Sequence, residues 1–199
     1  MTWRESVVEY IRAEAQPADK FGHQPRLYAL AAEIGRELPH DDDVLFAAAW
    51  MHDLGVFLGH RPADPAELAR WNHVPYTIEH ARQLLASWSF PGEKLDAVAA
   101  AIQTHQPHDD PATPEGIILR DADMLEQLGA VGILRSMVKV GRDSRYPTYS
   151  AAIPVLEKAL GQLPGKLRLE HSRKLALSRV DILRSFLDAV RVEAGELLY

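Results

Sequence analysis

The chain has 199 residues, of which 47% are hydrophobic and 25% are charged, a composition that allows a globular protein with a sizeable core. It contains no cysteine, which excludes disulfides, thiolate metal sites and cysteine nucleophiles and fits a reducing compartment. The net charge of −6 argues against a general nucleic-acid binder, because phosphate backbones need clustered lysine and arginine.

The charge is unevenly distributed. Residues 1–134 contain 10 Lys and Arg against 21 Asp and Glu, a balance of −11, whereas residues 135–199 contain 12 against 7, a balance of +5. Solvated helix faces explain this most simply; alternatively, the acidic part holds a cation and the basic part meets an anionic substrate. The sequence shows no signal-peptide core and no apolar run of the roughly 20 residues that span a membrane, so we expect a cytoplasmic protein without membrane contact.

The predicted elements are helices, because apolar residues recur at steps of three and four. Leu27, Leu30 and Ile34 form one stripe on a helix that ends near Pro39. His23 lies four residues before Leu27 and projects from the same stripe. This places a histidine on the apolar face of the first of these helices.

A second helix is predicted over residues 44–53, with an acidic start at 41–43 and Gly55 after its end. Further helices are predicted over residues 75–88, 95–105, 114–128, 131–140, 150–160 and 168–194. Loops cover 56–72, which has room for a short helix, and 141–148. No useful period-2 alternation is present, so we predict an all-α protein with a single domain over residues 1–199.

Residues with metal-binding chemistry lie on these apolar helices. His52 and Asp53 are neighbours at the end of the helix predicted over 44–53, and two adjacent helical residues can share one ion only from a helix end. His23, His80 and His105 each lie on an apolar side of a predicted helix. Burying such rings without partners costs on the order of 1–3 kcal/mol each, so a shared metal ion is an economical partner. The alternative for each is a core histidine with ordinary hydrogen bonds.

The ordered motifs resemble those of HD-domain phosphohydrolases. They are the segments 22–26 (GHQPR), 52–55 (HDLG) and 121–125 (DADML). The segments 129–135 (GAVGILR) and 175–179 (LALSR) look like those of a bacterial subfamily of small stand-alone HD proteins, some of which are associated with nucleotide pyrophosphohydrolase activity. The resemblance implies a compact HD-type helical bundle, with the metal cage within residues 20–130 and the C-terminal helices 131–199 completing the site and the core.

The resemblance also implies the metal ligands, which are His23, His52, Asp53 and Asp123. Mixed imidazole and carboxylate donors suit Mn, Fe, Co, Ni or Zn better than Mg. We expect one ion and keep two as the alternative. Helical periodicity places Asp121, rather than Asp123, on the apolar face of its helix, so Asp121 remains an alternative ligand.

Two further histidines, His80 and His105, have two open roles: they hold a second ion, or they face the substrate and the attacking water. Together with Asp53 they are the candidates for accepting the water's proton. The remaining histidines receive no catalytic role. His60 and His73 are expected to be solvated in or beside the loop 56–72, with a role in a lid as the alternative.

The expected reaction is hydrolysis of a phosphoester or phosphoanhydride bond in a small phosphorylated substrate, a nucleotide by the resemblance. Candidate phosphate-binding residues, chosen by charge and position, are Lys139, Arg142, Arg145 and Lys174. Two other functions stay open. The combined ligand set also resembles that of HD-fold di-iron oxygenases, and the fold would also suit a non-catalytic nucleotide sensor, although the intact ligand set counts against the sensor.

Overall fold

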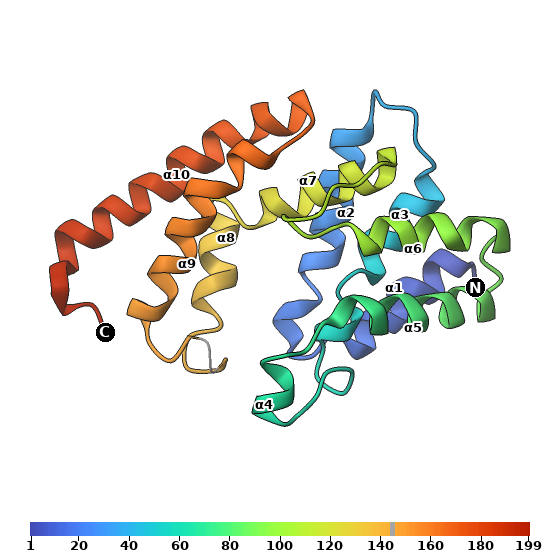
Figure 1. Cartoon of the computed structure of the whole chain (residues 1–199), viewed down its shortest axis with the longest axis horizontal. Helices are drawn as coiled ribbons and strands as arrows, with labels where there is room; N and C mark the ends of the chain where they lie inside the picture. The colour runs from blue at the N-terminus through green and yellow to red at the C-terminus, as the bar shows by residue number, and fades with distance from the viewer. Residues whose placement is uncertain (144–145) are drawn as a thin grey trace. The chain divides into compact units, whose positions relative to one another are not determined.

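The computed structural model describes residues 1–143 and 146–199 (Figure 1). All its regular elements in these two ranges are helices, which confirms the predicted all-α class. None of the described helices is long and apolar enough to cross a membrane. The chain divides into two compact units, residues 1–120 and 121–199, and the prediction of a single domain stays a prediction.

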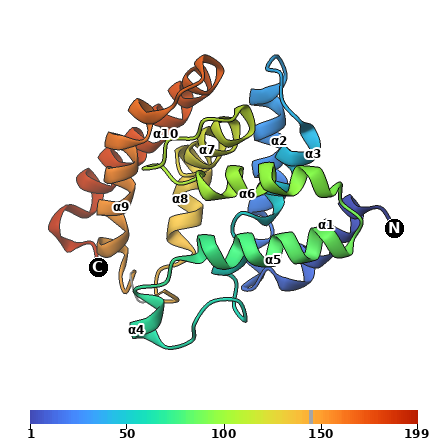
Figure 2. The ribbon, with the colours of Figure 1, turned by 45° about the vertical axis from the view of Figure 1, so that its right-hand side comes forward.

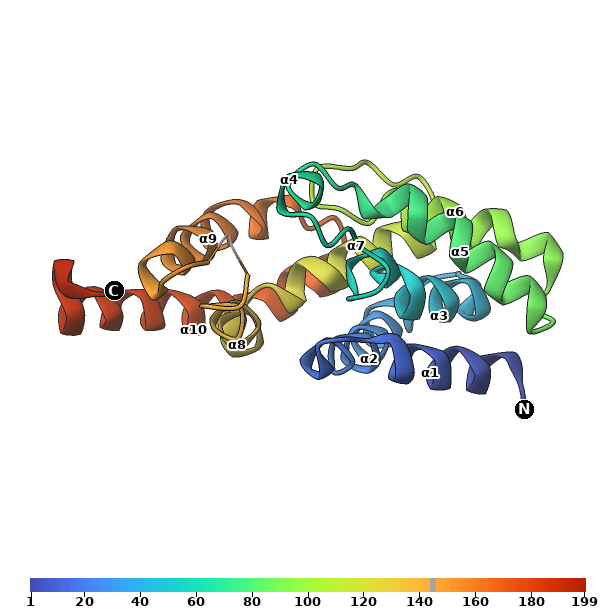
Figure 3. The same ribbon diagram turned by 90° about the horizontal axis from the view of Figure 1, so that it is seen from below.

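The first unit contains six helices and the start of a seventh. They are α1 (Trp3–Glu14), α2 (His23–Gly35), α3 (Asp42–Met51), α4 (Pro65–Leu68), α5 (His73–Ser87), α6 (Leu95–Gln103) and α7 (Pro114–Glu126), which ends in the second unit. Helix α3 packs against α1, α2 and α6, and every residue from 44 to 51 is buried. Figure 3 shows α1 and α2 on one side of α3 and the pair α5 and α6 on the other. This buried helix is therefore the support on which the site is built.

The acidic segment before α3 caps that helix, as the sequence predicts. The Asp41 carboxylate accepts hydrogen bonds from the backbone N–H groups of Asp43 and Val44, at 2.9 and 3.3 Å. Two cations neutralise the cluster: Arg4 lies 2.7 Å from the carboxylate of Asp43, and Lys94 lies 2.9 Å from the same group. The Arg4 guanidinium and then the Lys94 ammonium lower the pKa of Asp43.

Helices α5 and α6 lie side by side and are joined by a short connection (Figure 2). Helix α5 begins with Asn72 as its cap, whose side-chain oxygen accepts a hydrogen bond from the N–H of Val74 at 3.1 Å. Helix α6 ends at Gln103, two residues before His105. The start of α5 and the end of α6 thus each carry a histidine, namely His73 and His105.

The second unit contains the end of α7 together with α8 (Gly129–Met137), α9 (Tyr149–Gln162) and α10 (Glu170–Ala194). Helices α8, α9 and α10 pack on one another. Gly129, with φ +67°, starts α8, and a Cβ at this position would lie 3.1 Å from the Cα of Arg179 on α10. The glycine therefore allows α8 and α10 to approach closely. This contact brings together the two C-terminal segments on which the family resemblance rests.

Candidate metal centre

One group of metal-binding side chains is built from two helix ends. His23 is the first residue of α2, and His52 immediately follows the last residue of α3. The Nε2 atoms of the two rings are 3.3 Å apart, and they lie 3.9 and 3.6 Å from Oδ2 of Asp53. One donor atom from each of the three residues lies within 4.8 Å of the others, which is close enough to hold one ion.

The orientation of His52 suits a metal ligand. Its Nδ1 lies 3.0 Å from the carbonyl oxygen of Ala49 in the previous turn of α3. A carbonyl only accepts hydrogen bonds, so Nδ1 carries the proton and Nε2 presents its lone pair to the group. His105 is held in the same way, because its Nδ1 lies 2.7 Å from the carbonyl oxygen of Ile102. Such hydrogen bonds fix the ring and the tautomer that a metal site needs.

A second group shares Asp53 with the first. It consists of Asp53, His73 and His105, with one donor atom from each within 4.8 Å of the others. His73 Nε2 is 3.6 Å from Oδ1 of Asp53, whereas His23 and His52 face Oδ2 of the same carboxylate. The His105 ring, a member of the second group, is also close to the first, with its centroid 5.1 Å from that of His52 and 5.6 Å from that of His73. The two oxygens of Asp53 thus point to two neighbouring sets of imidazoles.

The electrostatics of Asp53 reflect this environment. Burial by itself raises the pKa of the carboxyl group, but the attraction of His52, then of His23 and His73, outweighs it and holds the pKa well below its usual range. The side chain is 20% exposed. Asp53 is therefore ionised at neutral pH and available as an anionic ligand.

His80 is placed differently from the expectation. Its ring stacks on Tyr76 with centroids 3.8 Å apart, and its Nδ1 lies 3.0 Å from the Tyr76 carbonyl oxygen. It belongs to neither three-residue group among the described residues. His73, expected to be solvated, is instead the α5 histidine that faces Asp53, and its side chain is 17% exposed. His60 is also largely buried, with its ring nitrogens 2.9 Å from Tyr76 Oη and 3.0 Å from Glu14 Oε2.

The two candidate aspartates of α7 lie in the second unit and differ in their contacts there. Asp121 is fully buried, and its carboxylate accepts hydrogen bonds from the backbone N–H groups of Arg168 and Leu169 at 2.9–3.1 Å. These residues directly precede α10, so Asp121 serves as a cap from a distant helix. The Asp123 carboxylate accepts a hydrogen bond from Gln127 Nε2 at 3.0 Å. These contacts favour a structural role for Asp121, and the assignment of Asp123 as a ligand stays a prediction.

The basic candidates for phosphate binding lie in the second unit as well. Lys139 Nζ lies 5.6 Å from the centre of the Tyr146 ring, and Arg142 donates a hydrogen bond to the Val138 carbonyl at 3.3 Å. Lys174 forms an exposed ion pair with Glu170 at 2.7 Å, of the kind that joins successive helical turns. Arg145 lies outside the described residues. Phosphate contacts by these residues remain a prediction.

The chemistry of the donor set fits a divalent transition-metal ion. Imidazole nitrogens with fixed tautomers and an ionised carboxylate are ligands that Mn, Fe, Co, Ni and Zn accept. His52 is fully buried, and His23 and His105 are 4% and 3% exposed, so an ion would bind to donors that the protein encloses. The first group alone supplies three donors, which leaves coordination positions for a substrate.

The chain belongs to the HD domain family, which matches residues 21–128. This is a family of metal-dependent phosphohydrolases, and its match covers both three-residue groups of the first unit. No protein of curated function matches the sequence.

Solved structures have a similar fold over nearly the whole chain. The Bacillus subtilis protein YpgQ in complex with ADP is 21% identical with a TM-score of 0.73, over 98% of this chain and 99% of that one. A predicted HD superfamily hydrolase from an uncultured Thermotogales bacterium is 25% identical with a TM-score of 0.63, over 97% and 91% of the two chains. An HD-superfamily hydrolase from Bacillus thuringiensis is 18% identical with a TM-score of 0.68, over 96% and 95%.

Proposed function

We propose that this protein is a metal-dependent phosphohydrolase that cleaves a phosphoester or phosphoanhydride bond of a nucleotide. The observation that carries the proposal is the convergence of His23, His52 and Asp53 at two helix ends, with their donor atoms within 4.8 Å of one another. The ligand of YpgQ, which is ADP, supports a nucleotide as the substrate class.

In this proposal, metal binding and proton transfer are assigned to different residues of the chain. His23, His52 and Asp53 would hold the ion, with Asp123 as the fourth ligand that the family resemblance implies. A bound ion would supply positive charge that makes a nearby water more acidic and offsets the charge developing on the phosphoryl group. His105 presents Nε2, because its Nδ1 donates to the Ile102 carbonyl, and in this proposal it accepts the proton of the attacking water.

A second ion is the alternative use of the second group. Asp53, His73 and His105 also form a set of three donors, and Asp53 turns one oxygen to each set. This arrangement keeps a di-iron oxygenase as the second candidate function. Iron in a ratio of two per chain, together with oxygen consumption and no phosphate release, would favour the oxygenase.

The test compares His52→Ala and Asp53→Ala with His171→Ala, which removes an exposed histidine of α10 to which we assign no role. The proteins are purified without added metal, and metal content is measured by elemental analysis. Phosphate release is then followed with a panel of nucleoside mono-, di- and triphosphates. We expect both site variants to lose metal and activity while their circular dichroism stays helical. Wild-type activity in either variant would refute the proposed centre.

A further inference from the structure

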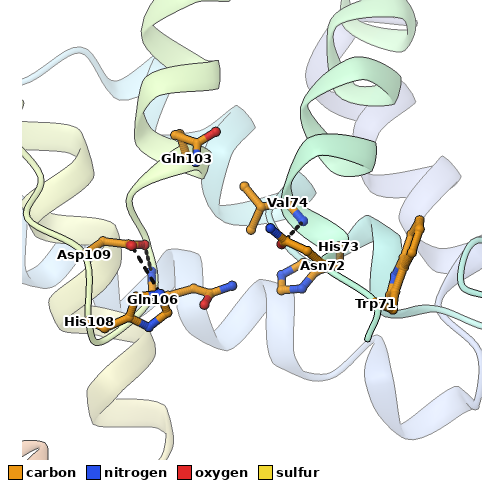
Figure 4. Close-up of a pocket in the computed structure, with 8 residues that line it drawn as sticks. All are labelled: Trp71, Asn72, His73, Val74, Gln103, Gln106, His108 and Asp109. Carbon is orange, nitrogen blue, oxygen red and sulfur yellow. Dashed lines mark hydrogen bonds and ion pairs between the residues drawn. The ribbon is translucent and has the colours of Figure 1, made fainter. Parts of the chain in front are cut away.

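A polar pocket of about 290 Å³ lies beside the second group of histidines. Residues 71–74, at the start of α5, line one side, and Gln103, Gln106, His108 and Asp109, at the end of α6 and after it, line the other (Figure 4). His73 belongs both to this lining and to the second group, so the pocket directly adjoins the candidate metal centre. Its volume is close to the lower end of the roughly 300–1,000 Å³ typical of small-ligand sites.

The lining of this pocket is unsuited to phosphate. Its described residues contain no lysine or arginine, and its one carboxylate, that of Asp109, accepts a hydrogen bond from the Gln106 N–H at 2.9 Å. The two histidines of the lining, His73 and His108, already lie 3.6 and 3.5 Å from the carboxylates of Asp53 and Asp109. An anion brought here would therefore meet like charge and neither lysine nor arginine. The neutral end of a substrate suits the pocket better than its phosphates do.

Neutral hydrogen-bonding groups dominate instead. The side-chain amides of Gln103 and Gln106 make no hydrogen bond within the described part of the chain, so they are available to a ligand. Each amide offers both a donor and an acceptor. A ligand with alternating donors and acceptors on a planar edge, as nucleobases have, can use both.

The walls that carry these groups are held in place by other contacts. The Trp71 indole N–H donates to the Gly55 carbonyl at 2.8 Å, which fixes the aromatic ring at the pocket's edge. Across the pocket, the buried Arg120 guanidinium donates to the carbonyls of Gln106 and Pro107, at 3.3 and 3.0 Å. A fixed aromatic ring offers a face on which a planar ligand can stack. Because the loop is already ordered, ligand binding does not include the entropic cost of ordering it.

We infer that this pocket binds the nucleoside part of the substrate, with the base recognised by the amides of Gln103 and Gln106 and packed against Trp71. The inference rests on the proposed function, because it takes the neighbouring histidines and Asp53 as the place where the phosphate is cleaved. It assigns the selection of the nucleoside to the first unit and to residues apart from the metal ligands.

The first experiment measures binding without catalysis. The protein is labelled with ¹⁵N at its four tryptophans, and the Trp71 indole signal is identified by its loss in Trp71→Phe. Adenosine, guanosine, cytidine, uridine and thymidine are titrated separately into metal-free protein, and inorganic tripolyphosphate is titrated in parallel. We expect at least one nucleoside to shift the Trp71 signal at concentrations at which tripolyphosphate does not. A shift by tripolyphosphate and by no nucleoside would overturn the inference.

The second experiment measures selectivity. Gln106→Leu is compared with Gln83→Leu, the same change at an exposed position ten residues beyond His73 on α5. The readout is the kcat/KM for the preferred nucleotide divided by the kcat/KM for tripolyphosphate. We expect Gln106→Leu to lower this ratio about tenfold, as the loss of a paired hydrogen bond does, and Gln83→Leu to leave it unchanged. An unchanged ratio in Gln106→Leu would refute base recognition by this residue.

The two experiments also separate this inference from the proposed function. A nucleoside-dependent shift of Trp71 in a protein that releases phosphate from no substrate would support the pocket and refute the hydrolase. Phosphate release that depends on His52 but is equally efficient for nucleotides and tripolyphosphate would support the hydrolase and refute the pocket.

Discussion

Replacing Asp121 with asparagine, and Asp123 likewise, tests whether these two aspartates of α7 have different roles, one structural and the other in metal binding. The Asp121 carboxylate is fully buried and accepts hydrogen bonds from two backbone N–H groups, those of Arg168 and Leu169, just before α10. Oδ2 accepts from both N–H groups, at 3.1 and 2.9 Å, and Oδ1 also accepts from Arg168 at 3.1 Å. An asparagine with its oxygen in the Oδ2 position keeps both bonds in neutral form and turns an N–H₂ donor toward the Arg168 N–H. The negative charge that favours the start of a helix is lost as well.

The size of the effect follows from these contacts. A hydrogen bond to a charged group contributes about 1.5–3 kcal/mol and a neutral one about 0.5–1.5 kcal/mol, so each of the two bonds loses about 1–1.5 kcal/mol when its acceptor becomes a neutral amide. We therefore expect Asp121→Asn to lower the free energy of unfolding by about 2–4 kcal/mol. For a chain of this size the midpoint should fall by roughly 4–16 °C, at about 2–4 °C per kcal/mol. Asp123→Asn should cost under about 1 kcal/mol, because an amide oxygen can still accept the hydrogen bond from Gln127.

The assay has two readouts for each variant. Thermal unfolding is followed by circular dichroism on chelator-treated protein, which removes any contribution of bound metal to the midpoint. Metal affinity is measured by equilibrium dialysis and elemental analysis. We expect a lowered midpoint for Asp121→Asn and lowered metal affinity for Asp123→Asn. A wild-type midpoint together with lost metal in Asp121→Asn would show that the structural interpretation of its contacts is wrong.

Two further predictions concern the α5 histidines and the start of α3. In the two-ion alternative, His73→Ala should lower the metal content from two ions per chain to one and His80→Ala should leave it unchanged, as elemental analysis would show; the reverse order would return the role to His80. Asp43→Asn should lower the free energy of unfolding by about 1 kcal/mol at pH 7, because Arg4 and Lys94 both contact this carboxylate. The folded-state pKa of Asp43 is lowered, so its contribution is complete above the ordinary aspartate pKa of about 3.9 and is lost as pH falls through the lower folded value. Urea unfolding at pH 7 and at pH 3 should therefore show the difference from wild type shrinking in acid, and a constant difference would contradict this account.

The sequence predicts the helices well, because each buries a regular apolar stripe. Residues 44–53 illustrate this, since α3 occupies Asp42–Met51 and is capped by Asp41 from the predicted acidic segment. The prediction that His52 and Asp53 act together from a helix end agrees with the observed end of α3 at Met51. Helix α1 is not among the predicted helices, although Thr2 and Glu5 form a capping box at its start and this pattern is visible in the sequence.

Helical periodicity alone cannot decide whether His73 or His80 faces Asp53. These residues are seven positions apart, nearly two helical turns, so both lie on one face of α5 but roughly 10 Å apart along its axis. Which of them faces Asp53 depends on whether the first or the last turns of α5 lie near the end of α3. That placement is set by contacts across the loop 56–72, such as the hydrogen bond from Trp71 to the Gly55 carbonyl. Long-range contacts of a loop leave no periodic signal in the sequence.

The charge of the centre bears on how a polyanionic substrate is attracted. In the two groups of the first unit the one carboxylate is that of Asp53, so a single divalent ion with neutral imidazoles leaves a net charge of +1. Asp123 as a further ligand would bring the charge to zero, whereas a second divalent ion would raise it to +3 without Asp123 and to +2 with it. A nucleotide's phosphates are attracted most where two ions bind, and with one ion and both aspartates they need cations from elsewhere. The number of ions and the importance of Lys139 and Arg142 are therefore linked: substitution of these cations should weaken substrate capture strongly in a one-ion centre and little in a two-ion centre.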